Sequence, residues 1–186
     1  SSPPTVTFSM ADANNNAIIG FGATNKTSTA TVPSLANLRF SLAKLVPGAN
    51  GSPSKWVNYI VTTVPTTTAT AAPRTPTADR EGTLVDNKNG TYTYTFYRDV
   101  PKIKDQVAAM TVTGSNNKAD LGDLTYDPNL THRLTIQVSG DAPGTGSNTP
   151  TGAASGVTAV PLANPINVIY DFIPATGQVA TAAQSR

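Results

Sequence analysis

The chain has 186 residues, no cysteine, a single histidine and a formal net charge of +2. This composition excludes disulfides, Cys-ligated zinc, a zinc site built from several histidines, and a haem attached through Cys-x-x-Cys-His within this chain. Charged residues are only 13% of the total and form no basic stripe interleaved with aromatics, so nucleic acid is not expected as a partner. The length fits one domain with a hydrophobic core of its own.

Alternation of apolar and polar residues predicts strands in the first third of the chain. The segment TVTFSM (5–10) places its apolar residues on one face, and NLRFSLAKLV (37–46) does the same. The segment SKWVNYIVTTV (54–64) is compatible with a helix at its start, but the β-branched residues at its end favour a strand.

Two stretches are rich in threonine, proline, glycine and alanine. The first, 61–80, holds almost no large apolar residue and is expected to form a long exposed loop, with its Thr/Pro-rich centre at 65–77. The second, 140–156, has the same character. Loops of this length inside a compact domain are either functional or disordered.

The segment GTLVDNKNGTYTYTF (82–96) predicts a β-hairpin. Asn89-Gly90 lies between two extended runs, and this pair adopts the positive φ angles of tight hairpin turns. Tyr92, Tyr94 and Phe96 then share one face of the second strand. They would serve either as a platform for a flat ligand or as part of the core, and the second interpretation is favoured because aromatics pack well on the pleat of a sheet.

Further strands are predicted at 108–114, at 124–140 after a turn at Asp127-Pro128, and at 164–174. No convincing amphipathic helix is found. About eight or nine short strands indicate an all-β fold, an antiparallel Greek-key split barrel or a sandwich. We expect a single β domain over 1–174 and a linker over 175–186, because the last residues are small and polar.

Acidic residues offer two candidate sites, and neither pattern is specific. Asp120, Asp123 and Asp127 lie close in sequence, but their spacing matches no calcium loop, so solvated turns are the favoured interpretation. Carboxylates for glycoside hydrolysis would have to come from Asp79, Glu81, Asp86 and Asp99, and nothing in the sequence pairs them. No Gly-x-Ser-x-Gly occurs. An enzyme is therefore not expected, and neither a catalytic nor a metal site is predicted.

His132 stands at the start of a predicted strand and allows two interpretations. It either forms hydrogen bonds to a loop, as boundary histidines do, or supplies a metal ligand to a partner. From the chemistry of the residue alone, the first is favoured.

Four segments together resemble the N-terminal haem-free β domain of the OmcA/MtrC-like outer-membrane multihaem (decahaem) c-type cytochromes. They are LRFSLAKLVPGANGSPSKWVNYI (38–60), GTLVDNKNGTYTYTFYRDV (82–100), YDPNLTHRLTIQVSG (126–140) and NVIYDFIPATG (167–177). The runs LRFSLAKL and LTHRLTIQ are the most distinctive of these phrases.

The resemblance implies a non-catalytic scaffold or docking domain in a lipid-anchored protein on the extracellular face of the bacterial outer membrane. Such proteins pass electrons to metal oxides, soluble metals or flavins. It implies no cofactor in this chain, haem c in a downstream haem domain, and flavin as a candidate cofactor. The expected partners are haem domains of the same polypeptide, outer-membrane electron-conduit proteins, and mineral or flavin acceptors.

Two expectations depend on the same resemblance. His132 becomes a candidate axial ligand to a haem of the neighbouring domain. The segment 175–186 becomes a linker toward that domain. The alternative function, independent of the resemblance, is an Ig-like surface adhesion or carbohydrate-binding module.

Overall fold

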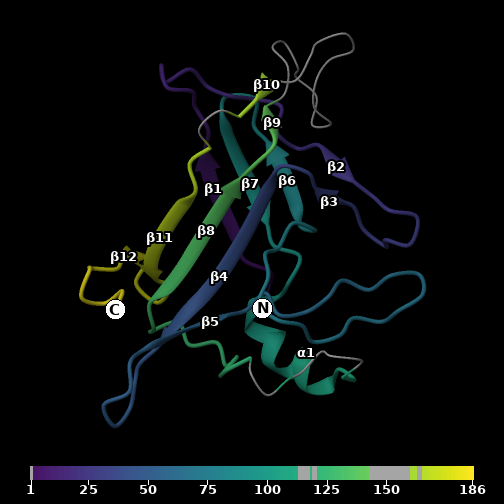
Figure 1. Ribbon diagram of the computed structural model, residues 1–186. Helices are drawn as coiled ribbons and strands as arrows, with labels where there is room; N and C mark the ends of the chain where they lie inside the picture. The colour runs from purple at the N-terminus through teal and green to yellow at the C-terminus, as the bar shows by residue number, and fades with distance from the viewer. Residues whose placement is uncertain (1, 113–117, 119–120, 143–159, 163–164) are drawn as a thin grey trace.

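The computed structural model describes residues 2–112, 118, 121–142, 160–162 and 165–186. Most of the predicted loop at 140–156, one end of the predicted strand at 108–114, and Asp120 lie outside these ranges. Within them, two antiparallel sheets pack face to face (Figure 1).

The larger sheet has five strands in the order β12-β11-β8-β4-β5. Their bounds are Gln178–Val179, Val168–Ile173, His132–Val138, Leu38–Val46 and Lys55–Asn58. At its centre β4 pairs with β8 over seven residues, from Leu38 opposite Val138 to Lys44 opposite His132.

The smaller sheet has three strands in the order β1-β7-β6, with bounds Thr5–Ser9, Thr91–Thr95 and Thr83–Asp86. Two short pairs complete the strands: β2 (Thr24–Asn25) with β3 (Ser34–Leu35), and β9 (Asp141–Ala142) with β10 (Val160–Pro161). The all-β antiparallel class is confirmed. Of the two expected architectures the structure is sandwich-like, and the described strands do not close into a barrel.

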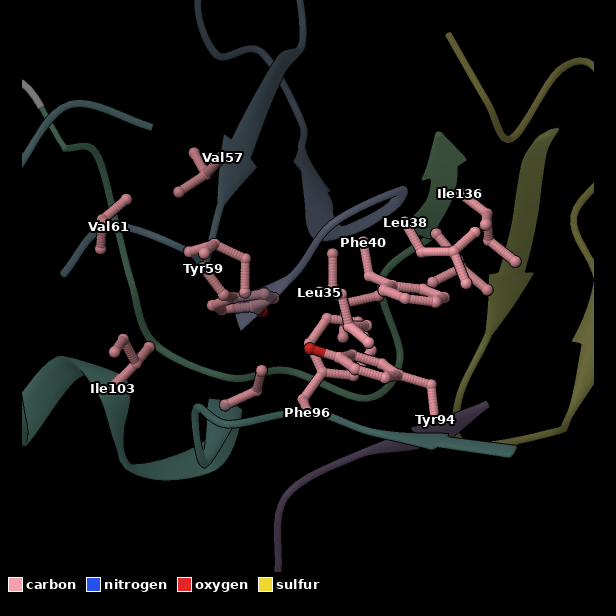
Figure 2. Packing of buried hydrophobic residues seen from close by; sticks show 14 of the residues in the cluster. Leu35, Leu38, Phe40, Val57, Tyr59, Val61, Tyr94, Phe96, Ile103 and Ile136 are labelled. Carbon is pink, nitrogen blue, oxygen red and sulfur yellow. The ribbon is translucent and has the colours of Figure 1, made fainter. Parts of the chain in front are cut away.

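The core lies between the two sheets and is rich in aromatic side chains (Figure 2). Phe40 of β4 stacks on Tyr94 of β7 with ring centroids 3.8 Å apart, and Phe8 of β1 packs against Phe40 at 5.6 Å. Tyr92, Tyr94 and Phe96 are buried, as the period-two pattern predicted. Their interpretation as core residues is confirmed, and they offer no exposed platform for a flat ligand.

The predicted strand at 108–114 is wrong over its described part. Residues Val100–Lys102 form the 3-10 helix η1 and Ile103–Ala109 the helix α1, at one end of the sandwich. Ile103 and Val107, four positions apart, are buried. The expectation that no amphipathic helix exists is therefore also wrong.

The expectation that 61–80 is an exposed loop is wrong at both ends of the segment. Thr62 bridges to Pro73, Arg74 N donates to the Val61 carbonyl at 2.9 Å, and Asp79 bridges to Phe40. Ala72 and Asp79 are buried. Backbone pairing, which composition does not report, holds these ends in place.

The hairpin prediction is confirmed, but its turn differs in detail. Residues 87–90 connect β6 to β7, and the positive φ angles fall on Lys88 (62°) and Gly90 (85°) rather than on Asn89. The Asn89 side chain instead accepts a hydrogen bond from Thr91 N at 3.0 Å.

Candidate functional site

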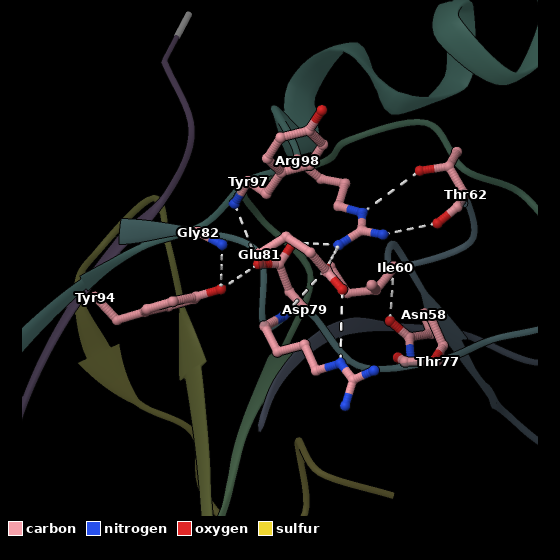
Figure 3. Close-up of polar contacts among 11 residues, drawn as sticks. Asn58, Ile60, Thr62, Thr77, Asp79, Glu81, Gly82, Tyr94, Tyr97 and Arg98 are labelled. Carbon is pink, nitrogen blue, oxygen red and sulfur yellow. Dashed lines mark hydrogen bonds and ion pairs between the residues drawn. The ribbon is translucent and has the colours of Figure 1, made fainter. Parts of the chain in front are cut away.

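A buried ion triad lies at the edge of the core, where the segment 61–80 meets β7 (Figure 3). Asp79 is fully buried, and its Oδ2 lies 3.0 Å from Arg98 Nη1. The same guanidinium nitrogen lies 2.6 Å from Glu81 Oε2. Removing one charge from such a buried cluster leaves the others uncompensated. The first role of the triad is therefore to stabilise the fold.

The remaining polar atoms of the triad are also satisfied. Tyr94 donates its hydroxyl hydrogen to Asp79 Oδ1, and Tyr97 N donates to the same oxygen at 3.1 Å. Arg98 Nη2 donates to the Thr62 carbonyl at 2.8 Å. Desolvation opposes the charge of Arg98, but the two carboxylates outweigh it and raise the pKa of Arg98 above its usual value.

Tyr94 is held as a neutral donor. Burial raises the pKa of its phenol well above the usual value, and the neighbouring carboxylate of Asp79 adds to the effect. Its oxygen also accepts from Gly82 N at 2.9 Å. A Cβ at Gly82 would lie 2.6 Å from that oxygen, so only glycine permits this contact.

A cavity of about 430 Å³ adjoins the triad. Arg98 and Glu81 contribute to its wall, together with Arg39 of β4 and Arg74 and Arg80 of the 61–80 segment. The sequence singled out Glu81 and Asp79 only as carboxylates near strands. The arginines were missed because they come from separate segments between residues 39 and 98, and no short-range pattern joins all four.

His132, the first residue of β8, lies in an aromatic enclosure. Its ring is fully buried and stacks on Tyr59 at 5.8 Å between centroids, with Tyr126 at 5.4 Å and Phe172 at 6.0 Å. Nδ1 lies 2.9 Å from the Leu130 carbonyl oxygen, which can only accept. The neutral ring therefore carries its proton on Nδ1, and Nε2 accepts from the Tyr59 hydroxyl at 3.3 Å.

Burial is the main reason why the pKa of His132 lies below its usual value, and the positive charge of Lys44 adds to this lowering. Both ring nitrogens are thus engaged inside this chain. The arrangement fits a histidine that is hydrogen-bonded to a loop and does not fit an exposed ligand. The axial-ligand role itself stays a prediction.

Three further acidic candidates have partners within the chain. Asp123 pairs with the buried Lys44 at 3.0 Å, and Asp127 accepts from Asn129 N at 2.9 Å. Asp86 accepts from Gly20 N at 2.8 Å. Over the residues that the structure describes, no group of three or more His, Cys, Asp or Glu side chains is arranged to hold a metal ion. Nor does any described helix have the length and apolar character needed to cross a bilayer.

Comparisons with known proteins give matches at the level of structure. No protein-family model matches the chain, and no curated protein does. The solved structure of MtrC from Shewanella baltica OS185 matches 97% of this chain, with a TM-score of 0.53 and 25% sequence identity. The structure of the outer membrane decahaem cytochrome OmcA matches 94%, with a TM-score of 0.47 and 20% identity.

The matched part is 21% of the MtrC chain, so this chain spans about a fifth of that relative. The fold similarity runs through both sheets, because almost every residue of this chain is covered. The resemblance to the OmcA/MtrC-like cytochromes that the sequence motifs indicated is thereby confirmed, as a structural likeness to part of such a protein.

Proposed function

We propose that this chain is the non-catalytic β domain of a cell-surface multihaem cytochrome, in which it positions haem-bearing domains of the same polypeptide. The observation that carries the proposal is the fold match to MtrC over 97% of this chain. The absence of cysteine supports a haem-free part, since c-type haem needs paired cysteines.

The finer parts of the proposal follow from the same resemblance. The whole protein would be lipid-anchored on the outer face of the outer membrane, receive electrons from an outer-membrane conduit, and pass them to metal oxides, soluble metals or flavins. The gene gives a direct test. A reading frame that encodes repeated Cys-x-x-Cys-His motifs beside this segment supports the proposal, and a frame with tandem β modules and no such motif contradicts it.

An apolar surface on the five-stranded sheet supports a packing role. We define the β11 surface as five exposed side chains: Ile166, Val168, Ile169, Tyr170 and Val179. Ile169 is 63% exposed and Val179 62%. Val168, Ile169 and Tyr170 are consecutive in β11 and point alternately to its two faces, while Ile166 precedes β11 and Val179 lies on the edge strand β12. Exposed apolar side chains that cluster at one edge of a sheet in this way mark interaction surfaces. Since the relative contains a large part that this chain does not match, we propose the rest of the polypeptide as the occupant.

Hydrogen exchange tests this assignment in the full-length cytochrome. Backbone amides of β11 should exchange more slowly there than in this chain alone, because a packed neighbour excludes water. Ile169→Lys should abolish that extra protection. The matched control is Val85→Lys on β6 of the other sheet, where the side chain is 51% exposed. Equal exchange of β11 in both contexts would rule out this surface as the interface.

A further inference from the structure

The cavity beside the ion triad has a positive lining that the proposed function does not use. Four guanidinium groups line it, those of Arg39, Arg74, Arg80 and Arg98. Two carboxylates oppose them, Glu81 on the lining and Asp79 behind it. The site therefore carries two surplus positive charges in a space of about 430 Å³.

The surplus positive charge can be assigned to particular arginines. Arg98 is paired with Asp79 and Glu81, and Arg80 Nε lies 3.6 Å from Glu81 Oε1. Within the described part of the chain, neither Arg39 nor Arg74 has a carboxylate partner. Arg39 donates to the neutral Ser139 hydroxyl, at 3.0 Å.

The walls of the cavity are held in place by backbone hydrogen bonds and by one side-chain hydrogen bond. Arg39 belongs to the central strand β4, and Arg74 N donates to Val61. Thr77 N donates to Ile60 at 2.9 Å, and Arg98 is fixed to the Thr62 carbonyl. A rigid wall lowers the entropic cost of ordering the side chains around a ligand.

The lining also limits the ligand class. Guanidinium groups present paired donors that match the oxygens of phosphate and carboxylate. None of the described residues on the lining is aromatic, and Val64 and Ala78 are its only aliphatic members. A planar ring system would find no aromatic partner there, only guanidinium groups. The volume falls in the range of small-molecule sites.

We propose that this cavity binds a small oxyanion with at least two negative charges, a phosphate or a polycarboxylate, through Arg39 and Arg74. Arg98 and Arg80 raise the positive potential while they remain paired with their carboxylates. The site is independent of the proposed packing role, so either can fail without the other.

Calorimetric titration of the chain with inorganic phosphate, and in a second arm with citrate, tests the proposal at constant ionic strength. At about pH 7.5 phosphate is mainly the dianion. Saturable one-site binding is expected in at least one arm. Phosphate alone would identify a tetrahedral site, citrate alone a carboxylate site, and both a general oxyanion site.

Variants locate the binding. Arg74→Gln and Arg39→Gln should each weaken it by about tenfold or more, because each removes a charge-assisted hydrogen bond. Lys104→Gln on α1 is the control with the same change in charge at an exposed position. Circular dichroism verifies that each variant is folded. Arg74→Lys keeps the charge but loses the paired donors of the planar guanidinium. Its affinity for the anion should therefore fall between those of the wild type and Arg74→Gln.

Two results would overturn the proposal. One is the lack of saturation by either anion, and the other is an equal loss of affinity in Lys104→Gln and Arg74→Gln, which would indicate general charge screening.

Discussion

Arg98 is a buried charged residue that pairs with two carboxylates. Its side chain is only 4% exposed and forms ion pairs with the fully buried Asp79 and with Glu81. The sequence could not reveal this pairing. Asp79 ends a stretch that looks like a loop by composition, and Arg98 follows β7 nineteen positions later. Only the fold brings the two together.

Replacing Arg98 with alanine should lower the free energy of unfolding by about 3–5 kcal/mol, because it leaves a buried carboxylate without its partner. Urea denaturation measures the effect. Lys102→Ala is the matched control, since its ion pair with Asp99 is 57% exposed at the lysine and should cost at most about 1 kcal/mol. Similar losses in the two variants would contradict a buried triad.

His132 should make the stability of the fold depend on pH. Its folded-state pKa is lowered, so between that value and about 6.5 the unfolded chain binds more protons than the folded one. Stability should therefore fall as the pH is lowered through this window, by at most about 1.4 kcal/mol per pH unit.

Chemical denaturation at a series of pH values checks this, with His132→Gln as the comparison. The charged and titratable groups around the ring are Lys44, Asp127, Tyr59 and Tyr126. Neither lysine nor tyrosine ordinarily titrates near pH 6, and carboxylates ordinarily titrate below it. A variant that keeps the wild-type slope in this window would show that another group is responsible.

At the scale of elements, strands with a regular alternating pattern were predicted from the sequence, whereas short or irregular elements were not. β1, β4, β7 and β8 follow an alternating pattern over five or more residues, which fixes both their type and their buried face. Helix α1 has only seven residues, too few for a helical period to stand out. β11 was expected from its apolar residues, but Val168, Ile169 and Tyr170 are exposed in this chain, and Phe172 packs against the core.

The β6–β7 hairpin depends on Gly90 for two separate reasons. Its φ is +85°, and an added Cβ would lie 2.8 Å from the Cβ of Ala17. Gly51 shares the positive φ (+81°) but has open space around it. Gly51→Ala should therefore cost about 1 kcal/mol of backbone strain, and Gly90→Ala should cost clearly more. Thermal denaturation of both compares them, and equal costs would mean that the contact with Ala17 is relieved without penalty.

At the scale of the whole molecule, the two sheets share one core. Phe40 contacts Phe8, Tyr94 and Phe96, so β4 of the larger sheet cannot separate from the smaller sheet without exposing several aromatic rings. Burial of that size makes unfolding cooperative. The all-β class and the antiparallel sandwich were accessible from the sequence, whereas the pairing of the sheets through these rings was not.

We expect a single unfolding transition. Trp56 fluorescence reports on β5 at the edge of the larger sheet, and near-ultraviolet circular dichroism reports on the buried tyrosines, among them Tyr92 and Tyr94 of the smaller sheet. The two signals should have the same denaturant midpoint. Separate midpoints would show that the sheets unfold as independent units.

The pairing of the 61–80 segment with the core also determines how the molecule meets a protease. Trypsin cleaves after arginine, and this segment contains Arg74 and Arg80, in a composition that suggests easy access. However, Arg74 N is bonded to Val61, and the carbonyl of Arg80 accepts from Leu35 N at 2.7 Å. A backbone segment that must first break such hydrogen bonds enters the active site of a protease slowly. A chain with the composition of a linker should therefore survive digestion at these two arginines for as long as the sandwich stays folded.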